Sequence, residues 1–284
     1  MGRRLLAPPP QREDDRVIPT TTIDQLTGLF TAVSTLCSDL TDEQWATPTD
    51  CPGWDVKDTV SHLIGTERLL QKLPATTHQA AAAEHVKNAI GQFNENEIDA
   101  RRARRGGEVL AEWNDLADLR LATLRAGDDA YFDEPTMTPT GPGTVADFLD
   151  VRILDVWSHE QDIRRALHRP GNLDSPAAGH TIDRLLRTLP IVVGKRARCP
   201  EGRAVRLIIT GPTQRDVTVE VNGGRAGVVG HSEQAPLATI TLDTETFVVL
   251  ALGRASVAAL GGSIEVQGDD ALGTTVVTQL NMMI

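Results

Sequence analysis

The sequence predicts two parts of different class, a helical bundle followed by a small α+β module. Apolar residues recur at three- and four-residue steps through residues 20–167, the spacing of one buried helix face. After about residue 174, short segments rich in β-branched residues alternate with Gly-containing turns. A length of 284 residues suits two domains. We therefore predict a four-helix bundle over residues 20–174 and an α+β domain over residues 175–284.

The composition excludes several classes of function. The net charge is −11, from 28 Lys and Arg against 39 Asp and Glu, so the chain would repel a nucleic-acid backbone. Aromatic residues make up only 4%, too few for platforms on which bases stack. No apolar run approaches the roughly 20 residues that a bilayer requires. We expect a protein that binds neither nucleic acid nor a membrane.

The cysteines and the first residues bear on location. Cys37, Cys51 and Cys199 are odd in number, far apart and form no C-x-x-C pair, which favours a reducing compartment, the cytoplasm. Residues 1–19 contain three consecutive prolines and no secretory apolar segment. We expect this stretch to be a mobile leader.

Four helices are predicted for the bundle. One of the threonines at 20–22 caps the first helix, and Asp55 caps the second. The Pro- and Gly-containing stretches before the second helix and before the fourth are predicted to be loops. The predicted helices cover residues 20–40, 55–70, about 80–102 (with 109–124 as a continuation after a Gly-Gly break) and 145–167, and the predicted loops cover 41–55 and 133–144.

The second domain is predicted from alternating patterns. Turn signals such as G-P-T-Q-R-D and N-G-G-R-A-G separate its strands. A helix opens the domain and another closes it. The predicted strands are 205–210, 217–222, 238–243 and 263–266, and the predicted helices are 181–194, 245–252 and a last one from 269 onward.

Three side chains form a candidate metal site. Asp155 and His159 are four residues apart on the fourth helix, so their side chains share one face. His62 lies within the second helix, and a bundle can hold a divalent metal between such helices. One Asp and two His leave a tetrahedral ion one open position, as in catalytic zinc sites. Zinc is the first expectation, although the ligand types also suit nickel, iron or manganese.

The same residues also have ordinary explanations. An Asp–His pair at this spacing is a common helix-surface contact. A single helical histidine such as His62 is often a partly buried residue without a ligand. The spacing alone leaves both interpretations open.

Long motifs carry a family resemblance. The runs C-P-G-W-D-V-K-D-T-V-S-H-L-I-G-T-E-R-L-L (51–70) and G-P-G-T-V-A-D-F-L-D-V-R-I-L-D-V-W-S-H-E-Q-D-I-R-R-A-L-H-R-P-G (141–171) resemble signature stretches of the mycothiol-dependent maleylpyruvate isomerase family. Residues 85–102 are similar to that family's third helix. Residues 263–281 are similar to the closing strand, turn and helix of its second domain. The resemblance implies a DinB-like metal-binding four-helix bundle followed by a sterol-carrier-like α+β domain.

The resemblance also implies a site. By position, His62, Asp155 and His159 correspond to the family's metal ligands. The founding isomerase has Glu where this chain has Asp155, so the shorter side chain is a departure that bears on the geometry of the site. The implied cofactors are a divalent metal, zinc by expectation, and mycothiol, whose thiol the metal deprotonates.

The resemblance implies a thiol enzyme acting on a small electrophilic molecule. The thiolate either adds to a cis alkene and leaves after rotation, as in an isomerase, or conjugates the electrophile, as in an S-transferase. The first alternative is a non-catalytic module in which the bundle binds metal or the carrier-like domain binds an apolar ligand. The second is a metal that only links helices, with Glu67 as a fourth ligand.

Other polar residues have weaker claims. Asp162 lies on roughly the face of Asp155 and His159, where it would orient a ligand from behind or pair with Arg165 or Arg101. A substrate carboxylate would suit an arginine, and nothing local selects among the candidates. These are Arg152, Arg164 and Arg165 on the fourth helix and Arg203, Arg206 and Arg225 in the second domain.

Overall fold

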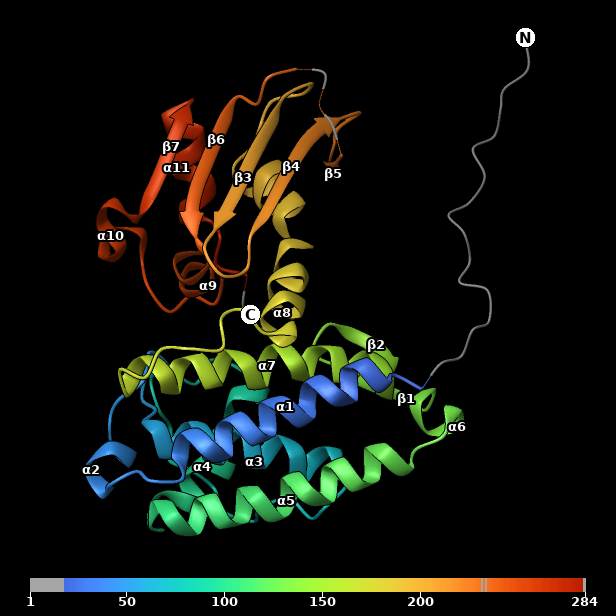
Figure 1. Cartoon of the computed structure of the whole chain (residues 1–284), viewed down its shortest axis with the longest axis vertical. Coiled ribbons are helices and arrows are strands. Elements are labelled where there is room, and N and C mark those ends of the chain that lie inside the picture. The colour runs from blue at the N-terminus through green and yellow to red at the C-terminus, as the bar shows by residue number, and fades with distance from the viewer. Residues whose placement is uncertain (1–17, 231, 233, 283–284) are drawn as a thin grey trace.

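The structure, a computed structural model, describes residues 18–230, 232 and 234–282. Figure 1 shows a helical part built from the first half of the chain and a sheet-containing part built from the remainder. The predicted fold class, helices first and a mixed α+β part second, is confirmed. The predicted leader falls almost wholly on residues 1–17, outside the described residues.

Four long helices form the bundle. Helix α1 packs against α5 and α7, and α3 packs against the same two helices from the other side. Their buried faces are apolar: Val33 on α1, Leu63 on α3 and Ile153 on α7 are fully buried. The bundle helices are α1 (Thr20–Cys37), α3 (Val56–Leu70), α5 (Gly106–Ala126) and α7 (Val145–Ala166).

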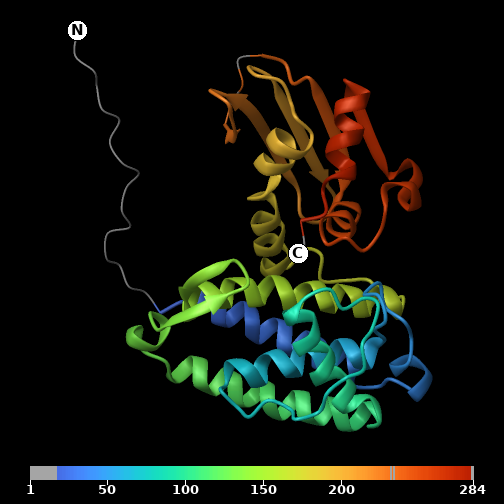
Figure 2. The ribbon, with the colours of Figure 1, turned by 180° about the vertical axis from the view of Figure 1, so that it is seen from behind.

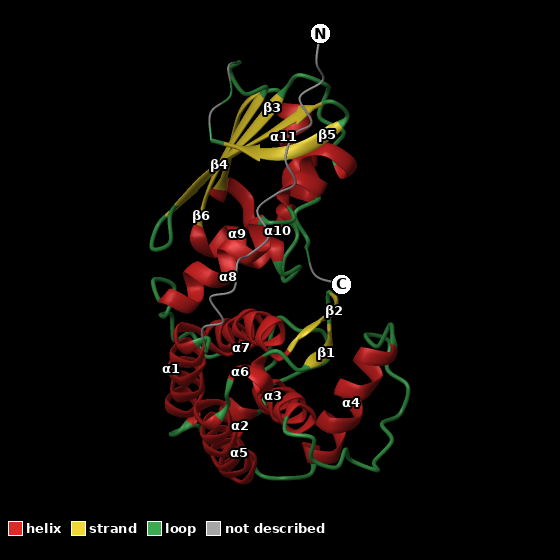
Figure 3. Ribbon diagram, turned by 90° about the vertical axis from the view of Figure 1, so that its right-hand side faces the viewer, coloured by secondary structure: helices red, strands yellow, loops and turns green. Residues whose placement is uncertain are grey.

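The third predicted helix needs a correction. Helix α4 (Ala89–Arg102) starts later than predicted and packs against α3 at the edge of the bundle, so α5 is the third bundle helix and no continuation of α4 (Figure 3). Residues 71–88 run without a helix, because side chains of α4 bind their backbone amides; Asn96, for example, accepts a hydrogen bond from the amide of Ala80. These bonds override the helix propensity of the alanine run.

The helix starts agree with the capping chemistry in part. Asp55 accepts a hydrogen bond from the amide of Asp58, as predicted for α3. Thr144 and Asp147 form a capping box at α7. For α1 the prediction is wrong, because Pro19 precedes the helix and no side chain caps it.

Both predicted loops of the bundle contain regular structure. Residues 41–55 hold the short helix α2 (Asp42–Trp45), which begins with a capping box between Thr41 and Gln44. Residues 133–144 hold the antiparallel hairpin of β1 (Pro135–Thr138) and β2 (Gly141–Thr144), preceded by α6 (Asp129–Phe132). Strands of four residues are too short to show a reliable period-two pattern.

The second part contains a five-stranded sheet in the order β5-β4-β3-β6-β7. Strands β3 and β6 are parallel, and the other neighbours are antiparallel. The sequence missed β5, because Gly223 and Gly224 adopt positive φ angles in a tight turn that leads straight into it. The strands are β3 (Ala204–Thr210), β4 (Arg215–Asn222), β5 (Arg225–Val229), β6 (Ala238–Asp243) and β7 (Ile264–Gly268).

Helices of this part lie on one face of the sheet (Figure 2). The predicted helix 181–194 is instead α8, which packs against α7 of the bundle, followed by the π-helix η1. None of the helices within the described residues is long and apolar enough to cross a membrane. The elements are α8 (Pro176–Leu186), η1 (Ile191–Arg196), α9 (Thr244–Ala251), α10 (Val257–Leu260), the 3-10 turn η2 (Gly261–Ser263) and α11 (Asp270–Thr278).

Candidate metal centre

Helices α3 and α7 bring the three predicted ligands together. Asp155 lies between the two imidazoles: its Oδ2 is 3.4 Å from His62 Nε2, and its Oδ1 is 3.6 Å from His159 Nε2. The two imidazole rings are 4.7 Å apart between centroids. One potential ligand atom from each residue lies within 4.8 Å of the others. The packing of α3 against α7 therefore unites a histidine with an Asp–His pair about 90 residues later in the sequence.

The geometry fits a tetrahedral cation. Ligand bonds of about 2.1 Å place neighbouring ligand atoms about 3.4 Å apart, close to the 3.6 Å between Asp155 Oδ1 and His159 Nε2. Both ring nitrogens of His62 are buried and form no hydrogen bond with any residue that the structure describes. A buried imidazole without a hydrogen bond is costly unless something binds it. The side chain of Asp155 is 25% exposed, which leaves one side of the group open.

The charges also favour a cation. Burial lowers the pKa of His62, which keeps this imidazole neutral and able to bind a metal. Burial acts against the charge of Asp155, but Arg152 and the imidazoles hold its pKa well below the usual range. Burial likewise opposes protonation of His159, yet the carboxylates of Asp155 and Asp162 raise its pKa well above normal. The field that retains a proton on His159 would equally attract a metal ion.

Trp54 forms a wall of the site. Its ring lies 5.2 Å from that of His62 and 5.9 Å from that of His159. The indole Nε1 donates a hydrogen bond to Glu95 on α4, and His85 contacts the same carboxylate at 2.9 Å. Helix α4 and the preceding segment thus fix the tryptophan beside the imidazoles.

Asp162 lies behind His159, on the side away from Asp155. Its Oδ2 is 3.1 Å from His159 Nδ1, the arrangement in which a carboxylate orients a histidine ligand. Of the two predicted ion pairs, the structure contains the one with Arg165, at 2.6 Å. Arg101 instead pairs with Glu97 on α4 and Glu112 on α5.

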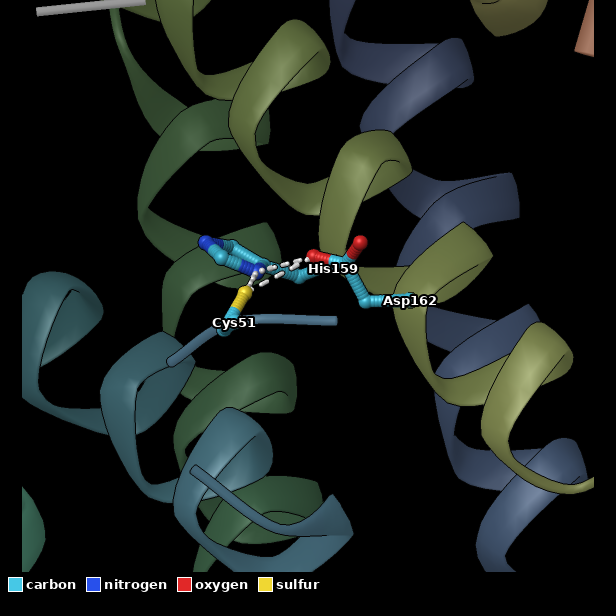
Figure 4. A group of neighbouring side chains, drawn as sticks. All are labelled: Cys51, His159 and Asp162. Atoms are coloured by element: carbon cyan, nitrogen blue, oxygen red, sulfur yellow. Dashed lines mark hydrogen bonds and ion pairs between the residues drawn. The ribbon is translucent and has the colours of Figure 1, made fainter. Parts of the chain in front are cut away.

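Two residues at this site were not predicted from the sequence as site residues. The thiol of Cys51 donates to Asp162 Oδ2 at 3.1 Å and lies 3.9 Å from His159 Nδ1 (Figure 4). Arg254, from the sheet-containing part, binds both oxygens of Asp162 at 2.9 Å. The position of Cys51 in the C-P-G-W-D run was a usable signal, whereas no local pattern marks Arg254.

Cys51, His159 and Asp162 also lie close enough to form a second metal-ligand group. Two guanidinium groups, from Arg165 and Arg254, already neutralise Asp162. A further cation there would meet both positive charges. Among the described residues, Asp155 has one guanidinium partner, Arg152, so a cation at the group of His62, Asp155 and His159 would meet less positive charge.

Several other candidate residues have partners elsewhere, whereas the Nε of Arg203 is buried without a hydrogen-bond partner among the described residues. Glu67 is buried and accepts hydrogen bonds from Arg152, so it lies outside the ligand group. Arg164 pairs with Glu160, and Arg206 pairs with Asp216 on the sheet. The arginines of α7 are thus engaged within the protein and are poorly placed to bind a substrate carboxylate.

Sequence comparison gives two family matches. Residues 26–164 match the mycothiol maleylpyruvate isomerase N-terminal domain, and residues 183–281 match the SCP-2 sterol transfer family. Two uncharacterized proteins from strains of Mycobacterium tuberculosis are each 27% identical over 139 residues. The match covers 46% of this chain and 51% of each relative, so the chain spans about half the length of these curated relatives.

Structural comparison agrees with both matches. A crystal structure of a mycothiol-dependent maleylpyruvate isomerase superposes with a TM-score of 0.55 at 14% identity, covering 87% of this chain and 92% of that one. A histidine-to-alanine mutant of such an isomerase gives a TM-score of 0.50 at 15% identity, with coverage of 83% and 89%. At these identities the likeness shows the shared fold. The two family matches relate the helical part to the N-terminal domain of the mycothiol maleylpyruvate isomerase family and the sheet-containing part to the SCP-2 sterol transfer family.

Proposed function

We propose that this protein is a metal-dependent enzyme that uses mycothiol to isomerise or conjugate a small electrophilic molecule. The convergence of His62, Asp155 and His159 on one partly open point carries the proposal. The match of residues 26–164 to the N-terminal domain of the isomerase family suggests the thiol and the reaction class. The three buried free cysteines suit a reducing compartment, so we place this activity in the cytoplasm.

Each residue of the site has a defined task in this proposal. His62, Asp155 and His159 hold a divalent cation, zinc by the balance of nitrogen and oxygen ligands. Asp162 accepts a hydrogen bond from the Nδ1–H of His159, which leaves Nε2 free as the ligand atom. Trp54 covers one side of the imidazoles and keeps water from it. When bound, the cation lowers the pKa of a thiol, so that the thiolate forms near neutral pH.

Metal content and thiol binding test the proposal. Wild-type protein should contain one metal equivalent, and His159→Ala should lose it. His78→Ala is the matched control, because His78 pairs with Asp99 on the surface of α4 and should leave the metal content unchanged. Calorimetric titration with mycothiol should give binding to the zinc-loaded protein. Unchanged metal in His159→Ala, or no heat with mycothiol, would reject the assignment.

Product analysis separates the two reactions. An isomerase forms and then breaks the sulfur–carbon bond, so the thiol concentration stays constant while the electrophile changes geometry. A transferase keeps that bond, so one thiol is consumed for each electrophile. A screen of maleylpyruvate and alkylating electrophiles with free-thiol assays will show whether the thiol concentration stays constant or falls as the electrophile reacts.

The match of residues 183–281 to the SCP-2 sterol transfer family supports a second candidate, an apolar-ligand module. Such binding should persist after the metal is removed with a chelator. A fluorescent fatty-acid probe that binds equally well to wild type and His159→Ala would favour this function.

A further inference from the structure

A chain of buried polar groups leads away from Asp155 into the bundle. Arg152 donates from Nη1 to Asp155 Oδ2 and, from Nε and Nη2, to Glu67 Oε1 at 3.0 and 2.8 Å. The other oxygen of Glu67 pairs with Arg120 Nε at 3.2 Å. Arg120 then donates to the hydroxyl of Tyr131 at 2.9 Å. The chain therefore connects α7, α3, α5 and α6.

These charges are deeply buried. The side chains of Arg152 and Arg120 are each 2% exposed, and that of Glu67 is 1% exposed. Two guanidinium groups and two carboxylates, including Asp155, cancel in charge. Desolvation of such ions is costly, and apolar residues of similar volume often stabilise a core as well or better. Stability alone therefore does not explain why these charged residues are buried here.

Asp155 differs from the rest of the network. Its side chain is 25% exposed, so the carboxylate could rotate toward water if nothing held it. Arg152 binds Asp155 Oδ2 and is itself fixed by two hydrogen bonds to Glu67. The planar guanidinium fork thus transmits a fixed orientation from the core to the edge of the metal group.

We propose that Arg152 is a positioning residue that holds Asp155 through Oδ2 and presents Oδ1 as the single ligand oxygen. This inference rests on the metal centre of the proposed function. Restricting Asp155 to one oxygen would keep a bound cation at a low coordination number and would leave one position open. Glu67 acts one step further back by fixing Arg152.

Two charge-matched double variants isolate this contact. The first variant, Glu67→Gln with Arg152→Gln, removes the contact of Arg152 with Asp155. The second, Glu67→Gln with Arg120→Gln, removes an equally buried ion pair but retains the contact of Arg152 with Asp155. Each variant loses one negative and one positive charge, so the net charge of the network stays at zero in both. A difference between them reports the contact of Arg152 with Asp155 and not the electrostatics of the core.

Zinc affinity and cobalt absorption are the readouts. Competition with a chromophoric chelator should show a dissociation constant raised about 10–100-fold in the Arg152 double variant, the usual effect of losing an outer partner of a ligand. In the Arg120 double variant, the amide oxygen left by Glu67→Gln can still accept the two hydrogen bonds that fix Arg152, so the zinc affinity should stay near wild type. The visible absorption of bound Co²⁺ should change in the Arg152 variant alone, because it reports coordination geometry, which a merely structural role would not alter.

If the double variants do not fold, a single variant can still test the role of Arg152. Arg152→Lys keeps the positive charge but cannot reproduce the planar fork. It should weaken zinc binding about tenfold or more at an unchanged fold by circular dichroism. Wild-type affinity and cobalt spectrum in Arg152→Lys would overturn the role of Arg152.

The two proposals fail in different ways. Equal zinc affinities and cobalt spectra in the two double variants, with wild type binding one equivalent, would overturn the positioning role and leave the metal centre intact. A wild-type protein that binds no zinc would overturn both.

Discussion

The two halves of the chain bury very different material. Among the residues that the structure describes, all fully buried Asp, Glu, Arg and His side chains lie in the helical part, ending at Asp162. The buried polar residues of the sheet-containing part are Thr181, Thr213, Thr244 and Thr246. Both parts also bury many aliphatic residues, so apolar packing alone can support either fold.

This contrast indicates where the chemistry lies. Buried charges cost free energy and are retained where a site needs them. In the helical part, the partly exposed Asp155 and the fully buried Asp162 flank the imidazoles of His62 and His159. The sheet-containing part contributes one long cationic side chain, Arg254, to this arrangement. It therefore reaches the site through this one side chain, while the polar side chains buried in its own core are threonines.

The largest expected effect comes from breaking the buried charge cluster. Asp162→Ala leaves Arg254 and Arg165 without their shared carboxylate, at 13% and 18% side-chain exposure. Loss of one partner of a buried pair costs about 3–5 kcal/mol. Urea denaturation should show this loss, and zinc affinity should fall about 10–100-fold because His159 loses its orienting partner.

Asp216→Ala is the matched control for that variant. It removes a carboxylate that also binds an arginine, Arg206, but on the exposed face of the sheet. Exposed ion pairs contribute little, so its stability and zinc affinity should stay close to wild type. Equal losses in the two variants would contradict the contrast between the two parts of the chain.

A smaller effect on the free energy of unfolding is expected from the buried thiol of Cys37, which lies in the apolar core of the bundle. Burial raises the pKa of the Cys37 thiol to about 12 from 9.0. Because the folded pKa is raised, this contribution to stability is complete below pH 9 and is lost as the pH rises toward 12. At pH 10.5 the loss is about 2 kcal/mol, from about 1.4 kcal/mol for each pH unit above 9.

Comparison with Cys37→Ala isolates this titration. Other groups ionise equally in both proteins, so the difference in unfolding free energy should shift by about 2 kcal/mol against wild type between pH 8 and 10.5. Urea denaturation at several pH values measures that difference. A constant difference across the range would show that the thiol is not shielded in the folded state.

Much of the fold followed from local patterns. The three- and four-residue apolar spacing predicted α1, α3 and α7 almost to their ends, because one face of each is continuously buried. The assignment of α4 failed because propensity favoured a helix over 80–88, while side chains of α4 bind that backbone. Strand β5 was hidden by its glycine-rich turn.

The site was predictable only where residues share an element. The spacing of Asp155 and His159 on α7 placed both on one face, but nothing local required His62 to meet them. That meeting depends on the packing of α3 against α7, and the family resemblance pointed to it. Arg254 lies 92 residues from Asp162 in the other half of the chain, so no helical or strand period relates them.

The smallest expected effect tests whether the two parts differ in anything besides charge. Ile240 on β6 and Ile153 on α7 are both fully buried. Ile240→Val and Ile153→Val each remove one buried methylene, and each should cost about 0.5–1.5 kcal/mol in unfolding free energy. Ile240→Val should leave zinc affinity unchanged, because the core of the sheet-containing part holds no ligand. Similar losses of unfolding free energy in the two variants would mean that apolar packing contributes equally in both parts of the chain. The two parts would then differ mainly in the buried charges beside Asp155 and Asp162. A change in zinc affinity for Ile240→Val would instead mean that the sheet core helps to shape the metal centre.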